Sequence, residues 1–287
     1  MQGRIVKGVG GLYQVLCQGE LFPCNARGRF RRDRQKPMVG DWVCFDPPQG
    51  DGNGYLTELL PRKNALLRPS VANVDLLVLV AAAAMPQPDL LLIDQLLTYA
   101  AAMELPAALV VNKADLADPA PILAQYGTLA WALPNDESLT GVPAIWEKIR
   151  GKTVCLAGQS GVGKSTLIAA LTQKDDLAVG SISPKTLHGR HTTRHVELLP
   201  VGDGFVVDTP GFSLLEMELL DPARLKDRYP EYAPYEGQCR FQGCLHDREP
   251  GCAVREAVRQ GILCPERHER YRVLLAEARQ KWKERYD

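Results

Sequence analysis

The order of two nucleotide-binding motifs constrains the fold of this 287-residue chain more than any other feature. A guanine-reading motif of the form N-K-x-D occupies residues 112–115, and a phosphate-binding loop of the form G-x-x-x-x-G-K-S occupies residues 158–165. In an ordinary GTPase domain the phosphate loop comes first and the base reader lies near the end. The reversed order predicts a circularly permuted domain with further segments attached at both new ends.

The phosphate loop has the sequence context that its chemistry requires. An apolar run at 153–157 precedes it and a helix-forming run at 166–171 follows it, which predicts strand, loop and helix in that order. Its glycines let successive backbone N–H groups face phosphate oxygens. Lys164 is expected to act in catalysis by reaching the β- and γ-phosphates, and Ser165 to ligate Mg²⁺. The predicted nucleotide contacts of the loop are Gly158, Gln159, Ser160, Gly161, Val162, Gly163, Lys164, Ser165 and Thr166.

The N-K-x-D motif indicates which base is bound. Asp115 can accept hydrogen bonds from the N1–H and amino group of guanine, whereas adenine offers no matching donors. Lys113 is expected to pack along the base, and Asn112 to tie this loop to the phosphate loop. A helix-capping turn would explain the four residues alone about as well. Together with a phosphate loop in the same chain, they favour GTP over ATP.

Two segments are predicted to respond to the γ-phosphate. Asp208 follows an apolar strand and is expected to hold Mg²⁺ through water, while Gly211 is expected to offer its N–H to the phosphate. The polar segment at 188–194 contains a threonine pair, of which Thr193 is assigned to Mg²⁺ by similarity to other GTPases, with Thr192 as the alternative. Because the second segment runs on toward the C-terminal cysteines, the permutation predicts that it moves the C-terminal domain.

The residue that activates the attacking water is not the usual glutamine. Phe212 occupies that position and cannot orient water by hydrogen bonding. His191 is the nearest side chain that could orient or deprotonate the water, and an exposed loop histidine is the alternative. Arg190 and Arg194 could stabilise charge in cis, but solvated loop arginines are the favoured explanation. Intrinsic turnover is expected to be slow, on the order of 10⁻⁴ to 10⁻² s⁻¹, so a partner should stimulate it.

A set of metal-ligand residues follows the predicted GTPase domain. Three cysteines and one histidine at 239, 244, 246 and 252 form a Cys₃His set of the kind that holds structural zinc. Disulfides are the alternative, but the chain shows no apolar leader and no run long enough to span a membrane, so a reducing cytoplasm is expected. The apolar spacing that follows this set is helical, which predicts a small helical domain stabilised by zinc. The predicted zinc ligands are Cys239, Cys244, His246 and Cys252.

The first 70 residues differ from the rest of the chain in sequence pattern and in charge. Short β-rich runs broken by glycine and proline predict a small barrel of the OB type. Six cationic side chains lie between Arg27 and Lys36, and this part of the chain is net basic although the whole chain has a formal charge of zero. Contact with nucleic-acid phosphates is the favoured interpretation, and a solvated charged loop is the alternative.

The chain is therefore predicted to be a multidomain α/β protein. Residues 1–70 would form the OB-fold domain that binds nucleic acid, 71–220 the circularly permuted GTPase domain with a mostly parallel sheet and flanking helices, and 221–287 the zinc-binding helical domain. The helix expected at 87–103 is interpreted as GTPase core. No feature demands a dimer, so a monomer is expected.

The complete motif order resembles one family. A barrel, N-K-x-D, the phosphate loop, H-T-T, D-T-P-G and then the cysteine–histidine set resemble the bacterial ribosome small-subunit-dependent GTPase A family over nearly the whole chain. The resemblance implies a cytoplasmic GTPase that binds rRNA late in maturation of the small (30S) subunit, is stimulated by that subunit, and leaves when GTP is hydrolysed. It implies GTP or GDP, Mg²⁺ and one structural Zn²⁺ as bound groups.

Two further functions remain as alternatives. The chain could be an RNA-binding protein that uses GTP as a structural or regulatory ligand outside ribosome assembly. The set formed by Lys164, Ser165, Asp208 and Thr193 favours hydrolysis, because a purely structural ligand needs no threonine on a mobile loop. A permuted GTPase for metal delivery is disfavoured, since a closed Cys₃His set leaves no exchangeable coordination position.

Overall fold

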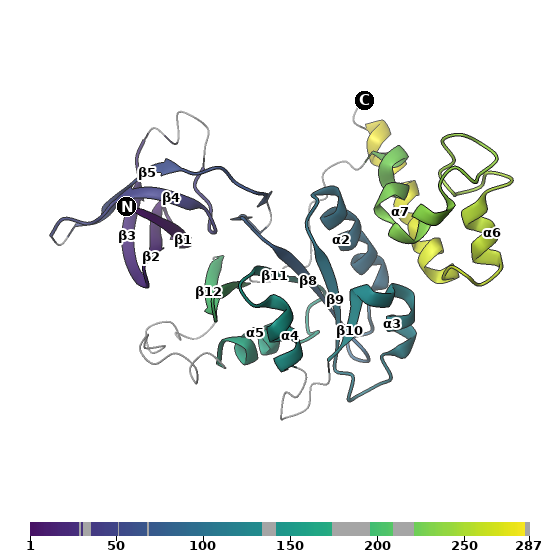
Figure 1. Ribbon diagram of the computed structural model, residues 1–287, viewed down its shortest axis with the longest axis horizontal. Coiled ribbons are helices and arrows are strands. Elements are labelled where there is room, and N and C mark those ends of the chain that lie inside the picture. Colours follow the sequence, from purple (N-terminus) through teal and green to yellow (C-terminus); the bar gives the residue numbers. More distant parts are fainter. Residues whose placement is uncertain are drawn as a thin grey trace.

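The computed structural model consists of three parts that follow one another along the chain (Figure 1). A β-rich part contains the N-terminus, a central α/β part follows, and a helical part lies at the opposite end of the molecule. The structure describes residues 1–28, 30, 36–50, 52–67, 69–133, 142–173, 196–208 and 221–284. Among the helices of these ranges, none has the length and apolar character to cross a membrane.

The N-terminal part is a closed five-stranded barrel. The order β1-β2-β3-β5-β4 is completed by pairing of β4 back to β1, which closes the sheet as in an OB-like barrel. Alternate side chains fill the interior, including Ile5, Val15 and Phe45. The strands are β1 (Gln2–Val9), β2 (Leu12–Cys17), β3 (Glu20–Ala26), β4 (Trp42–Asp46) and β5 (Gly54–Leu59).

The central part is a mostly parallel sheet with the order β10-β9-β8-β11-β13-β12. The first five strands are parallel, and β12 is antiparallel to β13. The strands are β8 (Leu76–Ala82), β9 (Ala107–Asn112), β10 (Ala130–Ala132), β11 (Thr153–Ala157), β12 (Glu197–Val201) and β13 (Gly204–Asp208). Strands β8, β9 and β11 are apolar along nearly their whole length, as expected where both faces of a parallel sheet are covered.

Helices cover the two faces of this sheet. Helices α2 (Leu90–Ala102) and α3 (Ala120–Tyr126) share one apolar core with alternate strand residues such as Leu77 and Leu79. Helices α4 (Val142–Ile149) and α5 (Lys164–Gln173) share the other core with Val78 and Val80. The 3₁₀ segment η1 (Gly127–Leu129) connects α3 to β10. The result is a three-layer α/β domain.

The barrel and the central sheet are continuous. Strand β1 pairs with β12 in antiparallel register at Lys7 and Glu197, so one eleven-stranded sheet includes both parts. A short hairpin of β6 (Ala65–Leu66) and β7 (Val71–Ala72) lies on the connection between them.

The C-terminal part is helical and has its own core. It contains η4 (Pro222–Arg228), η5 (Pro230–Tyr235), α6 (Ala253–Arg259) and α7 (Pro265–Glu284). The rings of Tyr229, Tyr232 and Tyr271 pack within 5.2 Å of one another between centroids, stacked or edge to face. This core packs against helix α2 of the central part, beside which α7 lies in Figure 1.

Candidate functional site

The predicted nucleotide-binding motifs meet at one edge of the central sheet. Strands β9, β11 and β13 are parallel, so their carboxyl ends emerge on the same side. Asn112 ends β9, the phosphate loop follows β11, and Asp208 ends β13. The chain continues from β8 to one side of the sheet and from β11 to the other, and such a reversal opens a crevice where ligands bind in α/β sheets.

The phosphate loop depends on glycine at two crowded positions. Gly158 has φ +141°, and a Cβ there would lie 2.2 Å from the carbonyl oxygen of Val80. Gly163 has φ +98°, and a Cβ there would lie 2.3 Å from Asn112 Nδ2. Any larger residue would displace the loop or the base reader, so the backbone can curl as predicted only with glycine.

Lys164 lies folded over the loop that precedes it. Its ammonium donates hydrogen bonds to the carbonyl oxygens of Gly158, at 2.7 Å, and Gln159, at 2.5 Å. Burial lowers the pKa of Lys164, because desolvation disfavours its charge. Phosphate oxygens would compensate that charge better than two neutral carbonyls, so the ammonium is suited to a polyanionic ligand at this edge. Ser165 and Thr166 begin helix α5 and are exposed.

Two side chains of the base reader bind the phosphate loop directly. Asn112 Nδ2 donates to the carbonyl of Val162 at 2.8 Å, which confirms the predicted tie between the motifs. Lys113 Nζ donates to the carbonyls of Gly161 at 2.9 Å and Met85 at 2.6 Å. Asn112 Oδ1 is buried and has no hydrogen-bond partner among the described residues, so it can accept a bond from a ligand. Asp115 lies exposed in the loop that follows.

Several predicted site residues lie outside the described ranges. They are His191, Thr192, Thr193, Arg190, Arg194, Gly211 and Phe212. Their assigned roles stay predictions. Asp208 lies within the described residues. It is half-buried at the end of β13, directly before the predicted γ-phosphate-responsive segment that contains Gly211.

One polar contact of the loop does not follow from the motif pattern. The side-chain Oε1 of Gln159 accepts a hydrogen bond from the backbone N–H of Asp89 at 3.0 Å. Asp89 is the N-cap of helix α2, and its carboxylate accepts from Leu92 N. The phosphate loop is therefore attached to the first turn of α2 by a side chain.

Helix α2 also carries a buried ion cluster that the sequence interpretation missed. Asp94 is 1% exposed and accepts from Arg267 Nη1 at 2.7 Å and from Arg270, both on α7. Arg267 also pairs with Glu231 of η5, and its guanidinium lies 4.6 Å from the ring of Tyr126. An aspartate within a largely apolar helix was the signal that this helix is more than sheet-covering core.

The four predicted metal ligands form one cluster. The sulfur atoms of Cys239, Cys244 and Cys252 lie 3.6, 3.5 and 3.3 Å from His246 Nδ1, and all four ligand atoms lie within 4.8 Å of one another. Tetrahedral Zn–S and Zn–N bonds imply S···N and S···S separations of about 3.6 and 3.8 Å. The sulfur atoms of Cys239 and Cys252 are 3.9 Å apart, well beyond the about 2.05 Å of a disulfide.

The electrostatics of this cluster suit a cation. Burial lowers the pKa of His246 to about 4, so its ring is neutral and able to ligate at pH 7. Burial raises the pKa of the Cys244 thiol to about 12, and an adjacent divalent cation would reverse that shift by stabilising the thiolate. Glu249 accepts backbone N–H bonds from Leu245 and Asp247 and thereby fixes the loop between the ligands.

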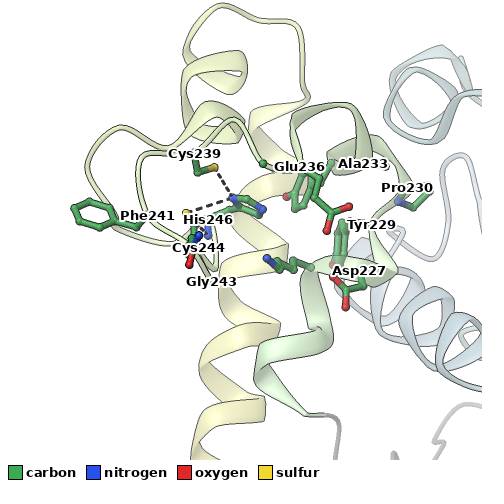
Figure 2. Close-up of a pocket in the computed structure, with 14 residues that line it drawn as sticks. Asp227, Tyr229, Pro230, Ala233, Glu236, Cys239, Phe241, Gly243, Cys244 and His246 are labelled. Carbon is green, nitrogen blue, oxygen red and sulfur yellow. Dashed lines mark hydrogen bonds between the residues drawn. The ribbon is translucent and has the colours of Figure 1, made fainter.

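A cavity of about 490 Å³ lies next to the cluster, between the metal-ligand loop and the 3₁₀ segments. Figure 2 shows His246 beside Cys239 and Cys244, with Phe241 pointing outward at the end of the loop. The ring of Tyr232 packs edge to face against His246 at 5.6 Å. Three of the four ligands line the cavity, so the metal cluster forms part of its wall.

The fold and the site define a class of protein. The sheet order places a phosphate loop on β11 and a base reader on the earlier strand β9, which is the arrangement of a circularly permuted P-loop GTPase. A sequence model described as RsgA GTPase matches residues 59–218, and one described as RsgA N-terminal domain matches residues 2–56. This chain belongs to the RsgA GTPase family.

Full-length relatives and solved structures agree with that membership. The chain is 40% identical to small ribosomal subunit biogenesis GTPase RsgA 2 of Listeria innocua, with 100% of both chains covered. It is 42% identical to small ribosomal subunit biogenesis GTPase RsgA of Carboxydothermus hydrogenoformans, covering 96% of this chain and 97% of the relative.

Two crystal structures also resemble it. YloQ, a circularly permuted GTPase, matches with a TM-score of 0.78 and 32% identity, covering 98% of this chain and 95% of the other. YjeQ from Thermotoga maritima matches with a TM-score of 0.79 and 34% identity, covering 96% and 98%.

Proposed function

We propose that this GTPase acts in the maturation of the small ribosomal subunit and that GTP hydrolysis times its release. Relatives that align over their full length carry the name small ribosomal subunit biogenesis GTPase. The observation that supports the chemistry most strongly is the pair of bonds from Asn112 and Lys113 to the phosphate loop, because they hold both halves of a nucleotide site in one crevice.

The nucleotide contacts follow from this geometry. Asp115 would read the guanine edge, with Lys113 along the base plane. The N–H groups of residues 158–163 and the N-terminus of α5 would face the phosphates, and Lys164 would exchange its carbonyl partners for phosphate oxygens. Ser165, Asp208 and Thr193 would hold Mg²⁺, which neutralises charge on the phosphates during transfer.

Hydrolysis requires an ordered water molecule. His191 would orient or deprotonate it, since Phe212 carries no hydrogen-bonding group, and Gly211 would contact the γ-phosphate through its N–H. Single-turnover hydrolysis by His191→Ala tests the assignment. A loss of about a hundredfold or more at unchanged GTP affinity is expected. An unchanged rate would remove the histidine from the mechanism.

The barrel would bind rRNA. Its support is the concentration of arginine between residues 27 and 36 on an OB-like barrel, a fold that binds oligonucleotides. Arg27 pairs with Asp46 at 2.6 Å and lies over the ring of Tyr55, an exposed aromatic residue of β5. Arg29, Arg31, Arg32 and Arg34 lie outside the described ranges, so their contacts with phosphate stay a prediction.

The Cys₃His cluster would hold one structural Zn²⁺. Four protein ligands would complete a tetrahedral set around the ion, which would leave no coordination position for water or substrate. Its role would be to fix the loop from 239 to 252 against α7. We further propose that the protein acts as a monomer in the cytoplasm, in contact with the small subunit and its rRNA.

GTP turnover with and without purified small ribosomal subunits tests the proposed function. We expect slow turnover by the protein alone and a large increase with small subunits. The increase should fall steeply as salt rises, because basic side chains release counterions when they bind RNA phosphates. Large subunits provide the matched control. Equal turnover with small subunits, large subunits and buffer alone would contradict the proposal.

A further inference from the structure

Helix α2 touches both the phosphate loop and the C-terminal domain within a short distance. Gln159 binds the backbone N–H of Asp89 at the start of the helix, and Asp94 binds the two arginines of α7. Five residues at a rise of about 1.5 Å each separate these two attachments by about 7.5 Å along the helix axis. A rigid helix of this length cannot move at one attachment without moving at the other.

The C-terminal attachment is broad and follows the whole helix. Beyond Asp94, Gln95 Nε2 donates to Glu277 of α7 at 3.4 Å. At the far end of α2, Arg228 of η4 donates to the carbonyl of Ala101 at 2.8 Å. These bonds extend from the second turn to the last turn, so α2 and the C-terminal domain behave as one body.

A small shift of α2 relative to α7 would break buried ion pairs of Asp94 and destabilise the protein. Asp94 and Arg267 are 1% and 6% exposed, so water cannot replace a lost partner. Arg270 also binds Gln125 Oε1 at 2.9 Å on helix α3, which extends the network across the same face of the sheet. A buried charge that loses its partner is strongly destabilised, so the network favours a single geometry.

The attachment of α2 to the phosphate loop lies beside Lys164, which is expected to bind the nucleotide phosphates. Lys164 holds the carbonyl of Gln159, the residue whose side chain holds α2. A triphosphate competes for the same ammonium, and the backbone of Gln159 must adjust when Lys164 changes partner. That adjustment reaches Asp89 through one hydrogen bond.

We infer that Gln159 and Asp94 are positioning residues that couple the phosphate loop to the C-terminal domain through α2. The route uses neither Asp208 nor the segment that follows it, so it differs from the coupling predicted from the permuted motif order. Because coupling between two sites is reciprocal, a partner that strains the C-terminal domain changes nucleotide affinity, and the nucleotide changes how that domain is held. The inference rests on the proposed nucleotide site.

A double-mutant cycle in the full-length protein tests this coupling. The affinities of a fluorescent GDP derivative and of a non-hydrolysable GTP analogue are measured for wild type, Gln159→Met, Asp94→Asn and the double variant. Methionine keeps the length of the side chain and removes the acceptor. We expect Asp94→Asn to change the ratio of the two affinities by about fivefold in the wild-type background. Close to no change is expected when Gln159 is already methionine.

Arg272→Lys is the matched control, because Arg272 lies on α7 but pairs with Asp247 and Glu269 within the C-terminal domain. It should leave the ratio unchanged in both backgrounds. Equal effects of Asp94→Asn in the two backgrounds, or no effect in either, would overturn the inference.

Hydrogen exchange in the wild-type protein gives a measurement that needs no variant. Exchange across residues 266–272 should differ between the GDP and GTP-analogue complexes, and identical exchange would also overturn the inference. The affinity and exchange measurements contain no ribosomal subunit. They therefore test the coupling separately from the proposed role in subunit maturation. Failure to bind either nucleotide would reject the nucleotide site itself, whereas tight binding with additive effects would reject only the coupling.

Discussion

The two joints that attach the outer domains to the central sheet are built from different interactions. The barrel joins through main-chain pairing of β1 with β12 and through Arg4, which binds the carbonyl of Asn73 and lies over the ring of Phe205 on β13. Among the described residues, the C-terminal domain joins through side chains that pair with Asp94 and with the carbonyl of Ala101 on α2. The first joint extends a sheet, and the second packs helices around buried charge.

This difference determines how each joint responds to substitution. The Lys7–Glu197 pair at the barrel joint is 2.8 Å long, but Lys7 keeps 38% of its side chain exposed, so water replaces much of what a substitution removes. Asp94 has no such compensation because its side chain is fully buried. We therefore expect substitutions at the C-terminal joint to lower the free energy of unfolding more than substitutions at the barrel joint.

The largest effect should follow loss of the proposed zinc ion from the C-terminal domain. Removing a metal ion, or changing Cys244 to serine, should unfold residues 221–284, since structural zinc contributes on the order of 10 kcal/mol to small domains. Zinc content and near-ultraviolet circular dichroism of the variant check this. Cys264→Ser is the control, because Cys264 lies outside the ligand cluster. Retention of a folded C-terminal domain without metal would show that its aromatic core suffices.

The next largest effect should come from Arg267→Met. This change leaves Glu231 without its partner and Asp94 with one arginine, at a cost of about 3 kcal/mol in the free energy of unfolding. Denaturant unfolding monitored by circular dichroism measures it. Arg279→Met, which removes a partly exposed partner of Asp247, should cost less than about 1 kcal/mol. Equal costs for the two variants would mean that burial does not distinguish these ion pairs.

An intermediate effect is expected at the barrel joint for Arg4→Met. Arg4 is 7% exposed, and its guanidinium donates to two backbone carbonyls and lies 5.0 Å from the ring of Phe205 on β13. Methionine keeps the apolar contact and loses the donors, so the free energy of unfolding should fall by about 1 to 3 kcal/mol. A thermal unfolding scan is sufficient. An unchanged free energy of unfolding would show that backbone pairing, and not Arg4, stabilises this joint.

The smallest effect should be that of Lys7→Met. Its ion pair with Glu197 is partly exposed, so we expect a loss of less than about 1 kcal/mol that disappears in high salt. Unfolding measured at low and high salt would reveal it. A loss as large as that of Arg267→Met would contradict the proposed difference between the joints.

Much of the central sheet and of both sites could be predicted from the sequence. The strands β9, β11 and β13 are short apolar runs that end in polar motifs, because parallel strands covered on both faces leave no room for alternation. The metal ligands fall within fourteen residues, so their spacing alone brings them together.

The remaining features depend on distant partners. Strand β3 has no clear strand pattern in the sequence because Pro23 interrupts it, yet Pro23 precedes the residues that pair with β5 and leaves that ladder intact. The role of α2 was missed for a different reason. Asp94 meets its arginines 173 and 176 residues further along the chain, and no local spacing indicates such a contact.

The strand order also has a consequence for how the protein is made. During synthesis the barrel strands β1 to β5 emerge first and can close on themselves. The base reader on β9 emerges next, but its strand lies two places from β11, which carries the phosphate loop. The base reader and the phosphate loop can meet once β11 has paired with β8, but the complete site, with Asp208 at the end of β13, cannot assemble until the chain has passed residue 208 and β13 has paired with β11. GTP added with Mg²⁺ to a growing chain should reach its full affinity only at this late stage, when nearly three quarters of the protein has been synthesised.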